Sequence, residues 1–377
     1  MMDVVGRILP YFLSLIDRID DSPLTMTLKS IIDRLKSVGA KDSHIALIMR
    51  AACGIVPWPG VDDERLPKAV RGILVQTKEA FDSAVQPAVI ERDEGTRSVK
   101  FVFALHDGHT IETVLLPRDG VCVSSQVGCA VGCVFCMTGR SGLIRQLTDL
   151  EIISQVLEAK KLRPETKKVV FMGMGEPSHN LVNVMSAIEF LGTYSAIGHK
   201  NLVLSTVGDK RVFDALNASR VKLALAISLH STIEDKRRQL LPKAGKIAIE
   251  ELVQKAEHYA RATGYPTQYQ WTLIEGVNDG EDELTNLVGL LKGHYAMVNF
   301  IGVNAVDKSP YCRPSEERIK ACVAALRREG IVCTLRDSAA QKIEGGCGQL
   351  RNRTLKVRGD LKGAICPDKA IDSEKTP

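Results

Sequence analysis

Gly128-Cys-Ala-Val-Gly-Cys-Val-Phe-Cys136 is the stretch from which both the fold and the chemistry can be inferred. It holds Cys129, Cys133 and Cys136, separated by three residues and then by two. Electron-carrying proteins bind a 4Fe-4S cluster through four thiolates, one for each iron. Three thiolates leave one iron open, as catalytic zinc keeps an open position for its substrate. The spacing therefore predicts a 4Fe-4S cluster bound by these cysteines.

An open iron distinguishes this motif from an electron carrier, because it can chelate S-adenosylmethionine (SAM) and pass it an electron. Gly128 and Gly132 suit the tight loop that such a site needs, since glycine adopts backbone angles that other residues resist. Two structural interpretations compete with this one, namely three buried thiols or a zinc knuckle. Zinc would need a fourth Cys or His at short spacing, and none lies between Cys136 and His179.

Length and composition indicate the class of protein. A chain of 377 residues with 45% hydrophobic residues can bury the core of one large α/β domain and of a smaller one. Ten cysteines and no secretory signal favour a reducing compartment, the cytoplasm. The apolar run 8–16 is far shorter than the ~20 residues of a membrane span, so we expect no membrane association. A net charge of +5 permits an RNA partner without requiring one.

The first part of the chain is predicted to be helical. Apolar residues at helical spacing indicate helices at 24–38, 44–53 and 68–84. We assign them to a small accessory domain spanning 1–95. Two strand-like runs follow at 99–104 and 110–116, joined across Asp107-Gly108. They predict a β-hairpin linker spanning 96–117.

From residue 118 onward, short apolar strands alternate with helices, as in parallel β-α units with right-handed crossovers. The six predicted strands are 121–126, 168–174, 201–206, 221–229, 267–275 and 296–303. The six predicted helices are 148–161, 181–192, 210–217, 249–263, 281–292 and 315–329. We therefore expect an α/β fold in which residues 118–345 form an open, partial (β/α)6 barrel with its chemistry at the carboxyl ends of the strands. Residues 346–377 are expected to form a cysteine-containing loop and a basic tail.

Polar and glycine-rich motifs follow the predicted strands. Phe171-Met-Gly-Met-Gly-Glu-Pro177 follows the second strand, where glycines let a ligand approach the backbone and Glu176 can accept hydrogen bonds from an ammonium group. The same run would also serve as an ordinary β-α turn. Ser205, Ser228-Leu-His230 and Asn304 end the third, fourth and sixth strands. Each is a weak signal alone, but together with the cluster motif they predict a rim that holds the carboxylate, ribose and adenine of SAM.

Two further cysteines lie outside the cluster motif. Cys122 precedes it by seven residues, and Cys347 lies in Gly345-Gly-Cys-Gly-Gln-Leu350, where flanking glycines keep it accessible. A single cysteine is most often a small buried hydrophobic residue. We apply that interpretation to Cys53, Cys312, Cys322, Cys333 and Cys366.

Taken together, the motifs resemble the RlmN/Cfr family of radical SAM RNA methyltransferases. The resemblance spans residues 99–350 and rests on Cys122-Val-Ser-Ser-Gln-Val-Gly-Cys-Ala-Val-Gly-Cys-Val-Phe-Cys136, Gly173-Met-Gly-Glu-Pro177, Ser228-Leu-His230 and Cys347-Gly-Gln-Leu350. Many radical SAM enzymes share the three-cysteine loop, whereas the earlier cysteine combined with the late Cys-Gly-Gln-Leu is peculiar to this family. Met137 and the segment 336–346 depart from the family pattern, so the chain resembles a divergent member.

The resemblance implies a partial barrel behind a helical N-terminal domain, a 4Fe-4S cluster, and two SAM per turnover. It implies methylation of an adenine ring carbon, C2 in preference to C8, in 23S rRNA and in some members tRNA. The implied SAM contacts are Gly175, Glu176, Ser205, Ser228, Leu229, His230 and Asn304. The implied partners beside RNA are a low-potential electron donor, such as flavodoxin or ferredoxin, and a thiol reductant.

Methylation of an adenine ring carbon explains why a cluster and two further cysteines are needed. The ring carbon has no lone electron pair with which to attack the methyl group of SAM. By the resemblance, Cys347 takes a methyl group from one SAM, and a 5′-deoxyadenosyl radical from a second removes hydrogen from it. The methylene radical adds to the base, Glu112 accepts a ring proton, and Cys122 attacks the sulfur of Cys347. Thiol exchange then reduces the disulfide. From its sequence context alone, Glu112 is an outward-facing residue of a hairpin strand.

Two rival functions remain open: a radical SAM enzyme that acts on a small molecule or peptide, and a nonenzymatic iron-sulfur or zinc module that binds RNA. Cleavage of SAM would distinguish an enzyme from a binding module. A methyl group on Cys347 would distinguish this mechanism from other radical chemistry. After the Cys347 loop, a basic run either contacts RNA phosphates beside a flipped base or forms a solvated tail; it comprises Arg351, Arg353, Lys356, Arg358 and Lys362.

Overall fold

The computed structural model describes residues 27–306, 309–336 and 340–351. The predictions for the apolar run 8–16, for the start of the first helix and for the basic residues Arg353, Lys356, Arg358 and Lys362 lie outside these residues. In the described part of the chain, no helix combines the length and the apolar character needed to cross a membrane.

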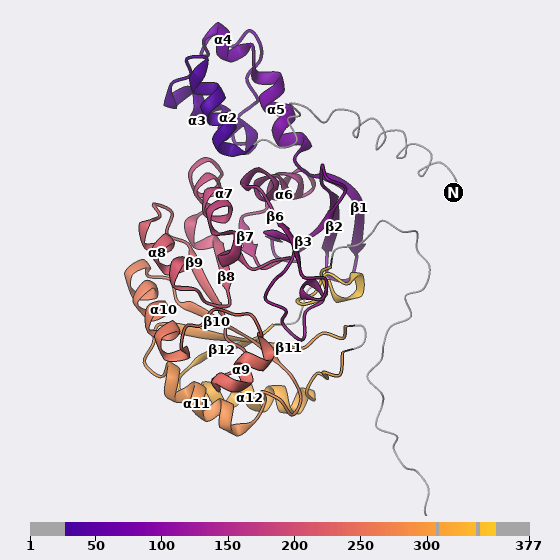
Figure 1. The fold of residues 1–377 in the computed structure, drawn as a ribbon, viewed down its shortest axis with the longest axis vertical. Coiled ribbons are helices and arrows are strands. Elements are labelled where there is room, and N and C mark those ends of the chain that lie inside the picture. Colours follow the sequence, from indigo (N-terminus) through magenta and orange to yellow (C-terminus); the bar gives the residue numbers. More distant parts are fainter. Residues whose placement is uncertain (1–26, 307–308, 337–339, 352–377) are drawn as a thin grey trace, which may run out of the picture.

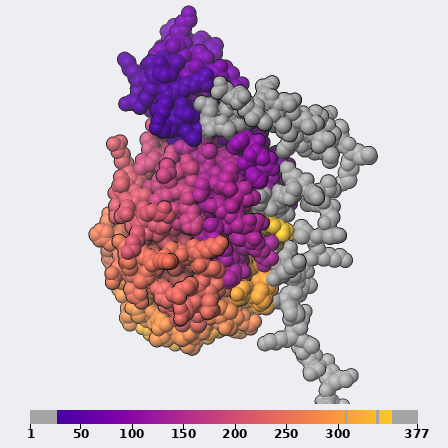
Figure 2. Space-filling view, in the orientation of Figure 1, coloured from indigo at the N-terminus to yellow at the C-terminus, as the bar shows by residue number. Residues whose placement is uncertain are grey.

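Short helices at the N-terminal end form a lobe that projects from the main body (Figure 1, Figure 2). They are α2 (Leu28–Ser37), α3 (Asp42–Ala52), α4 (Lys68–Arg71) and α5 (Leu74–Ser83). The Thr27 hydroxyl caps α2, and the predicted apolar face of that helix is buried. The helix predicted at 68–84 is divided at Gly72, because glycine loses more backbone freedom in a helix than other residues do.

One ten-stranded sheet runs through the body in the order β1-β2-β3-β4-β7-β8-β9-β10-β11-β12. Its antiparallel part comprises β1 (Gln86–Asp93), β2 (Ser98–Ala104), β3 (Thr110–Leu116) and β4 (Gly120–Cys122). The predicted hairpin is present as β2 and β3, but it is part of the sheet because β3 also pairs with β4. β1 corrects the assignment of residues 1–95 as helical. Pairing with β2 stabilises this partly exposed strand, and its own sequence has no clear strand alternation.

From β4 onward, all neighbouring strands of this sheet are parallel. The predicted strands correspond to β4, β7 (Lys168–Phe171), β8 (Leu202–Thr206), β9 (Ala224–Ser228), β10 (Thr267–Leu273) and β11 (Ala296–Gly302). The predicted helices correspond to α6 (Asp149–Leu162), α7 (Leu181–Tyr194), α8 (Lys210–Ala218), α10 (Ile249–Thr263), α11 (Glu281–Leu291) and α12 (Glu316–Arg328). The α/β fold with an open, partial barrel is therefore confirmed. A seventh parallel strand, β12 (Val332–Leu335), was not predicted; it pairs with β11 at the edge of the sheet.

Three small elements near the carboxyl ends of the strands were also not predicted. β5 (Gln126–Gly128) and β6 (Leu143–Gln146) form a separate antiparallel ribbon, so the strand predicted at 121–126 ends at Cys122. α9 (Glu234–Leu240) follows β9 and buries only Arg237 and Leu240. These elements surround the edge of the sheet at which the parallel strands end, which is the edge that holds the predicted site.

Candidate active site

The three cysteines of the motif lie next to one another in the loop between β5 and β6. Gly128 opens the loop with a φ of +79°, and a Cβ at this residue would lie 2.0 Å from the carbonyl oxygen of Gly142. The Cys129 amide donates to that same oxygen at 3.0 Å. The closure of the loop therefore requires glycine at position 128.

Burial and mutual proximity strongly affect these thiols. Burial above all, and the neighbouring Cys136 to a smaller extent, raise the pKa of Cys129 to about 12. Burial also raises the pKa of Cys133, with Cys136 and Cys129 as further causes. Thiols that raise one another's pKa in this way are close in space, and a bound cationic metal would stabilise their thiolate forms.

The donor set of this loop fits a 4Fe-4S cluster. Such a cluster binds each thiolate through a different iron atom, so three neighbouring thiolates can hold it. The loop packs among apolar side chains that would limit the access of water, including Val207, Leu241, Ile274 and Val303.

Glu176 is buried where the chain leaves β7. Its Oε1 accepts hydrogen bonds from the Thr206 hydroxyl at 2.5 Å and from the Ser178 amide at 3.0 Å. Its Oε2 accepts one from the Val207 amide at 3.1 Å. Because a carboxylate has about four acceptor positions, one remains on Oε2 for an external ammonium group. Glu176 therefore joins the ends of β7 and β8 in addition to the ligand role predicted for it.

The other predicted SAM contacts lie along the same rim. The hydroxyl oxygens of Ser205 and Ser228, at the ends of β8 and β9, are 3.4 Å apart. Gly175 has a φ of +103°, and a Cβ at this residue would lie 2.6 Å from the Cβ of Gln126. Leu229 is fully buried directly after β9. The fold thus brings these residues together across three neighbouring strands.

His230 is buried after β9 and has a φ of +60°. Its Nδ1 accepts a hydrogen bond from the Thr272 amide at 2.9 Å, so a neutral ring carries its proton on Nε2. Burial first, and the Arg237 guanidinium second, lower the pKa of His230 to about 3. The imidazole ring meets the Phe135 ring edge to face at 4.9 Å between centroids. His230 is therefore a neutral group in direct contact with the cysteine loop.

The loop that carries Cys347 rests on the cysteine loop. The Met137 amide donates to the Gly348 carbonyl at 2.7 Å. Gly348 has a φ of +81°, and a Cβ there would lie 2.8 Å from the Phe135 carbonyl oxygen. Asn304 Nδ2 donates to the Cys347 carbonyl at 2.8 Å. Asn304, predicted as a SAM contact, therefore also positions the backbone of the Cys347 loop.

Cys122 and Cys347 are far apart in the sequence but close in the fold. Burial raises the pKa of the Cys122 thiol well above its usual range, and the negative charge of Cys347 raises it further. Cys122 lies opposite Val114 of β3, and a Cβ at Gly345, two residues before Cys347, would lie 3.3 Å from the Val114 side chain, so both cysteines lie near the same part of β3. Cys347 is the exposed member of the pair. The fold therefore places a partly buried thiol near an exposed one.

Glu112 lies on β3 and is buried, so its outward orientation, inferred from its sequence context, was wrong. Its Oε2 accepts a hydrogen bond from the Arg351 amide at 2.9 Å. The Arg351 guanidinium in turn pairs with Glu344 at 3.2 Å, so this member of the predicted basic run has a partner within the protein. Because Arg351 follows the Cys347 loop, this hydrogen bond shows that Glu112 points toward that loop.

Three cations near the site, two of them buried, were not predicted from the sequence. Arg237 donates to the carbonyls of Leu229 and Val207 and lies near Cys133. Arg237 lies in a run of charged residues, which is typical of an exposed helix, so its burial could not be predicted. Arg336 is partly buried near Cys347; burial lowers the pKa of its guanidinium, and Cys347 opposes this. Lys100 could have been identified from the sequence, because it is the single charged residue in the apolar run 99–104.

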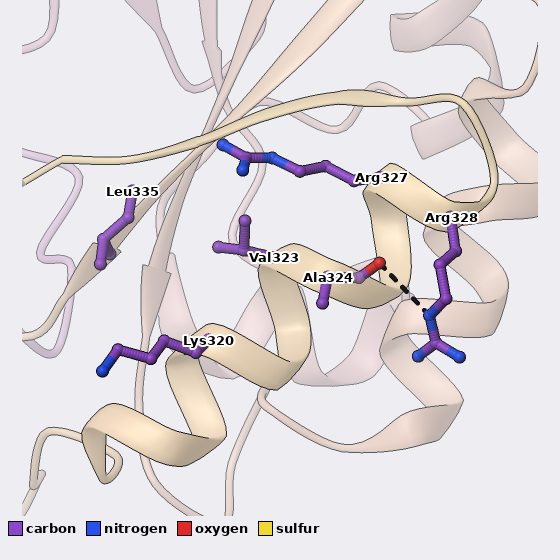
Figure 3. A pocket seen from close by; sticks show the side chains of 6 residues that line it. All are labelled: Lys320, Val323, Ala324, Arg327, Arg328 and Leu335. Atoms are coloured by element: carbon purple, nitrogen blue, oxygen red, sulfur yellow. Dashed lines mark hydrogen bonds between the residues drawn. The ribbon is translucent and has the colours of Figure 1, made fainter.

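A separate hollow of about 600 Å³ lies between α12 and β12 (Figure 3). It is lined by Lys320, Val323, Ala324, Arg327, Arg328 and Leu335, none of which was predicted as a site residue. Arg327 donates to the Cys333 carbonyl at 2.8 Å, and Arg328 Nε donates to the Ala324 carbonyl at 3.4 Å. None of the three basic side chains forms an ion pair with a carboxylate in the part of the chain that the structure describes. The hollow is therefore a cationic surface with an apolar floor.

Known proteins resemble the chain in sequence and in structure. Residues 123–288 match the model of the Radical SAM superfamily. A probable RNA methyltransferase of Leptothrix cholodnii is 53% identical over 333 residues, which cover 88% of this chain and 95% of that protein. Another, of Stutzerimonas stutzeri, is 51% identical over 339 residues, which cover 89% of this chain and 98% of that protein.

A radical SAM methyltransferase from Sphaerobacter thermophilus has a crystal structure that superposes with a TM-score of 0.76 at 34% sequence identity. The match covers 86% of this chain and 98% of that chain. These likenesses agree with the cysteine loop, the partial barrel and the resemblance to the RlmN/Cfr family. The chain is therefore a SAM-dependent radical methyltransferase and belongs to the radical SAM family that contains these probable RNA methyltransferases.

Proposed function

We propose that the protein methylates a ring carbon of adenine in 23S rRNA, C2 in preference to C8, with tRNA as a second candidate substrate. The names of the similar proteins and the cationic hollow support an RNA substrate. The proposal is carried by one observation, the proximity of Cys122 and Cys347 beside the three-cysteine loop. Methyl transfer to nitrogen or oxygen needs no such pair of thiols, because those atoms attack SAM directly.

Cys129, Cys133 and Cys136 would hold a 4Fe-4S cluster, which when bound supplies the electron that cleaves SAM to a radical. Flavodoxin or ferredoxin would be a suitable electron donor. SAM itself would lie along the rim formed by Gly175, Glu176, Ser205, Ser228, Leu229, His230 and Asn304. The remaining acceptor position on Glu176 suits the SAM ammonium group, and neutral His230 can donate from Nε2.

Cys347 would carry the methyl group. Its exposed thiol can reach a first SAM, while hydrogen bonds to its backbone keep the loop in place. The Arg336 guanidinium lies nearby, and the thiolate is the nucleophilic form of the sulfur. The sulfur takes the methyl group and loses its proton. After a radical derived from a second SAM removes one hydrogen from that methyl group, its carbon can bond to the adenine.

Release of the product would need Glu112 and Cys122. Glu112 accepts the proton from the ring carbon as a general base. Cys122 loses its own proton and bonds to the sulfur of Cys347, the carbon–sulfur bond breaks, and the carbon gains a proton to complete the methyl group. The electron left over returns to an electron carrier. A thiol reductant, as found in the cytoplasm, then reduces the Cys122–Cys347 disulfide.

The proposed function is tested by mass spectrometry of nucleosides from RNA incubated with the enzyme, SAM and a reductant under anaerobic conditions. We expect methyladenosine with the methyl group on C2, together with a methylated Cys347 peptide. Cleavage of SAM without methylation of RNA or of Cys347 would favour an enzyme that acts on a small molecule or peptide. Absence of SAM cleavage by an iron-loaded protein would favour a binding module.

Replacing Cys133 by alanine should prevent stable binding of the 4Fe-4S cluster, because two thiolates would remain for four irons. After anaerobic reconstitution, we expect the visible absorbance of the cluster, the bound iron and the cleavage of SAM to fall to background. Cys322→Ala is the matched control, since it removes a buried thiol outside the cysteine loop. Full iron loading of Cys133→Ala would contradict the assignment of this ligand.

Neutralising the hollow with Lys320→Gln, Arg327→Gln and Arg328→Gln should weaken RNA binding. If each cation meets one phosphate of a single strand, the slope of log K against log salt should fall by about 2. The affinity should be measured by fluorescence anisotropy at several salt concentrations. In the control, Lys210→Gln, Lys255→Gln and Arg261→Gln remove cations that already pair with Glu251 or Glu257, so the slope should not change. Equal slopes for wild type and the hollow variant would exclude the hollow from the RNA interface.

A further inference from the structure

Three charged side chains share one face of the antiparallel strands. Glu91 on β1 lies directly opposite Lys100 on β2. Glu112 on β3 lies opposite Val102, so it is a diagonal neighbour of Lys100. The side chains of Lys100 and Glu112 are 1% and 0% exposed, whereas that of Glu91 is 25% exposed. The row therefore leads from the buried Glu112 to a carboxylate that water can reach.

Distances between these groups connect them through the Lys100 ammonium. Its Nζ lies 2.6 Å from Glu91 Oε2 and 3.8 Å from Glu112 Oε1. It also donates to the Ile343 carbonyl. The three N–H groups of the ammonium thus face three acceptors, of which two are carboxylates. One ammonium between two carboxylates leaves a formal charge of −1, which can accommodate one additional proton.

The proposed reaction releases a net proton in a buried place. During product release the ring carbon loses one proton and Cys122 loses another, while the methyl group takes up only one. Glu112, which receives the ring proton, has no exposed surface through which to pass it to water. A base that stays protonated cannot act in the next turnover, so the proton needs an exit.

We propose that Lys100 and Glu91 are this exit, an inference that rests on the proposed role of Glu112 as the proton acceptor. The Lys100 ammonium gives a proton to the Glu91 carboxylate, and the resulting amine takes one from the Glu112 carboxylic acid. Glu91 then releases its proton to water. Each step moves one proton, and the row returns to one ammonium and two carboxylates.

The same two buried residues also hold the stems of the Cys347 loop. Lys100 donates to the Ile343 carbonyl, four residues before Cys347, and Glu112 accepts from the Arg351 amide, four residues after it. If Lys100 and Glu112 only held these stems, substituting either residue would displace the Cys347 sulfur and slow its methylation. If they carry protons away, substitution would slow only a later step and leave methylation of Cys347 intact. Measurement of the separate steps distinguishes the two roles.

Glu91→Gln is the sharpest variant, because it removes the proton acceptor at the exposed end and leaves Lys100 and Glu112 in place. Enzyme already methylated on Cys347 is mixed anaerobically with RNA, SAM and a reductant, and the first turnover and the later turnovers are followed separately. RNA attached to the protein is measured on denaturing gels, and methyladenosine is measured by mass spectrometry. We expect E91Q to form its first product at the wild-type rate, and in later turnovers to accumulate the covalent protein–RNA adduct and form product about 10-fold or more slowly, as on loss of a proton-transfer group. Glu94→Gln, an exposed carboxylate in the adjoining turn, should match wild type.

Lys100→Arg tests the middle of the route, because arginine keeps the positive charge and the donors but does not give up its proton. We expect normal methylation of Cys347 and the same accumulation of adduct. If either E91Q or K100R forms methyladenosine at the wild-type rate over repeated turnovers, the proton exit is overturned. If Glu112→Gln stalls at the adduct and E91Q does not, the exit fails and the proposed function stands. If wild type shows neither methylated Cys347 nor RNA product, the proposed function fails and the exit fails with it.

Discussion

Replacement of Cys347 by alanine is expected to reduce methylation of adenine by on the order of 10⁶-fold, the scale on which loss of a covalent nucleophile acts. Alanine cannot receive a methyl group, so the proposed carrier is lost. Cleavage of SAM should persist, because the three cysteines of the cluster loop remain. Methyladenosine in the RNA and cleaved SAM should therefore be measured in the same reaction, where we expect the first to vanish and the second to remain.

The loss should not arise from unfolding. Cys347 is exposed, and its loop is held by hydrogen bonds to the backbone, such as that from Asn304 Nδ2 to the Cys347 carbonyl. The free energy of unfolding should change by no more than about 0.5 kcal/mol. The control Cys53→Ala removes a buried thiol at the end of α3, so it should cost on the order of 1 kcal/mol of stability and preserve methylation. Product formation by Cys347→Ala at the wild-type rate would exclude the sulfur carrier.

Much of the fold could be predicted because its parallel strands are short apolar runs separated by amphipathic helices. The elements that were missed depend on contacts between distant segments. β12 has four residues and exists as a strand because it pairs with β11. β1 pairs with β2, although its sequence does not alternate between apolar and polar residues. The β5 and β6 ribbon forms where the chain closes the cysteine loop, so neither strand has a pattern of its own.

The site was predictable where a local motif requires a local geometry. The spacing of the cysteines and the glycine at position 128 describe a loop that closes within its own few residues. The orientation of Glu112 was not predictable in this way. β3 is buried on both faces, so its sequence shows no alternation that separates inside from outside. The same holds for Lys100, whose partners lie on β1, on β3 and near the C-terminal end of the described chain.

Long-range contacts account for the rest of the site. Asn304 looked like a ligand contact because it ends a strand, yet it donates a hydrogen bond to the backbone of Cys347. Arg237 lies in a run of charged residues and is nevertheless buried among carbonyl groups. Such roles arise only after folding, since each partner belongs to a different element. A residue type at a strand end therefore predicts that a site exists there more reliably than it predicts what the residue binds.

Replacement of Cys122 by alanine is expected to stop the reaction after the carbon has bonded to RNA. Methylation of Cys347 does not need Cys122, and neither does addition of the carbon to the base. In the proposed mechanism, breaking the carbon–sulfur bond does need it, because Cys122 is the thiol that attacks the Cys347 sulfur. We expect a covalent protein–RNA adduct that approaches one RNA per protein, and turnover reduced by roughly 10⁴-fold or more. Denaturing gels with labelled RNA, with and without ribonuclease, measure the adduct.

The adduct formed by Cys122→Ala should differ from that of Glu91→Gln in its response to an added small thiol. Burial keeps the pKa of Cys122 high, so the native thiol must lose its proton inside the site before it attacks. A small thiolate that reaches the exposed Cys347 sulfur can replace that attack in Cys122→Ala and release methylated RNA. It cannot restore the proton exit in E91Q. Release from both variants at equal rates, or from neither, would contradict the separate roles assigned to the thiol and to the carboxylate.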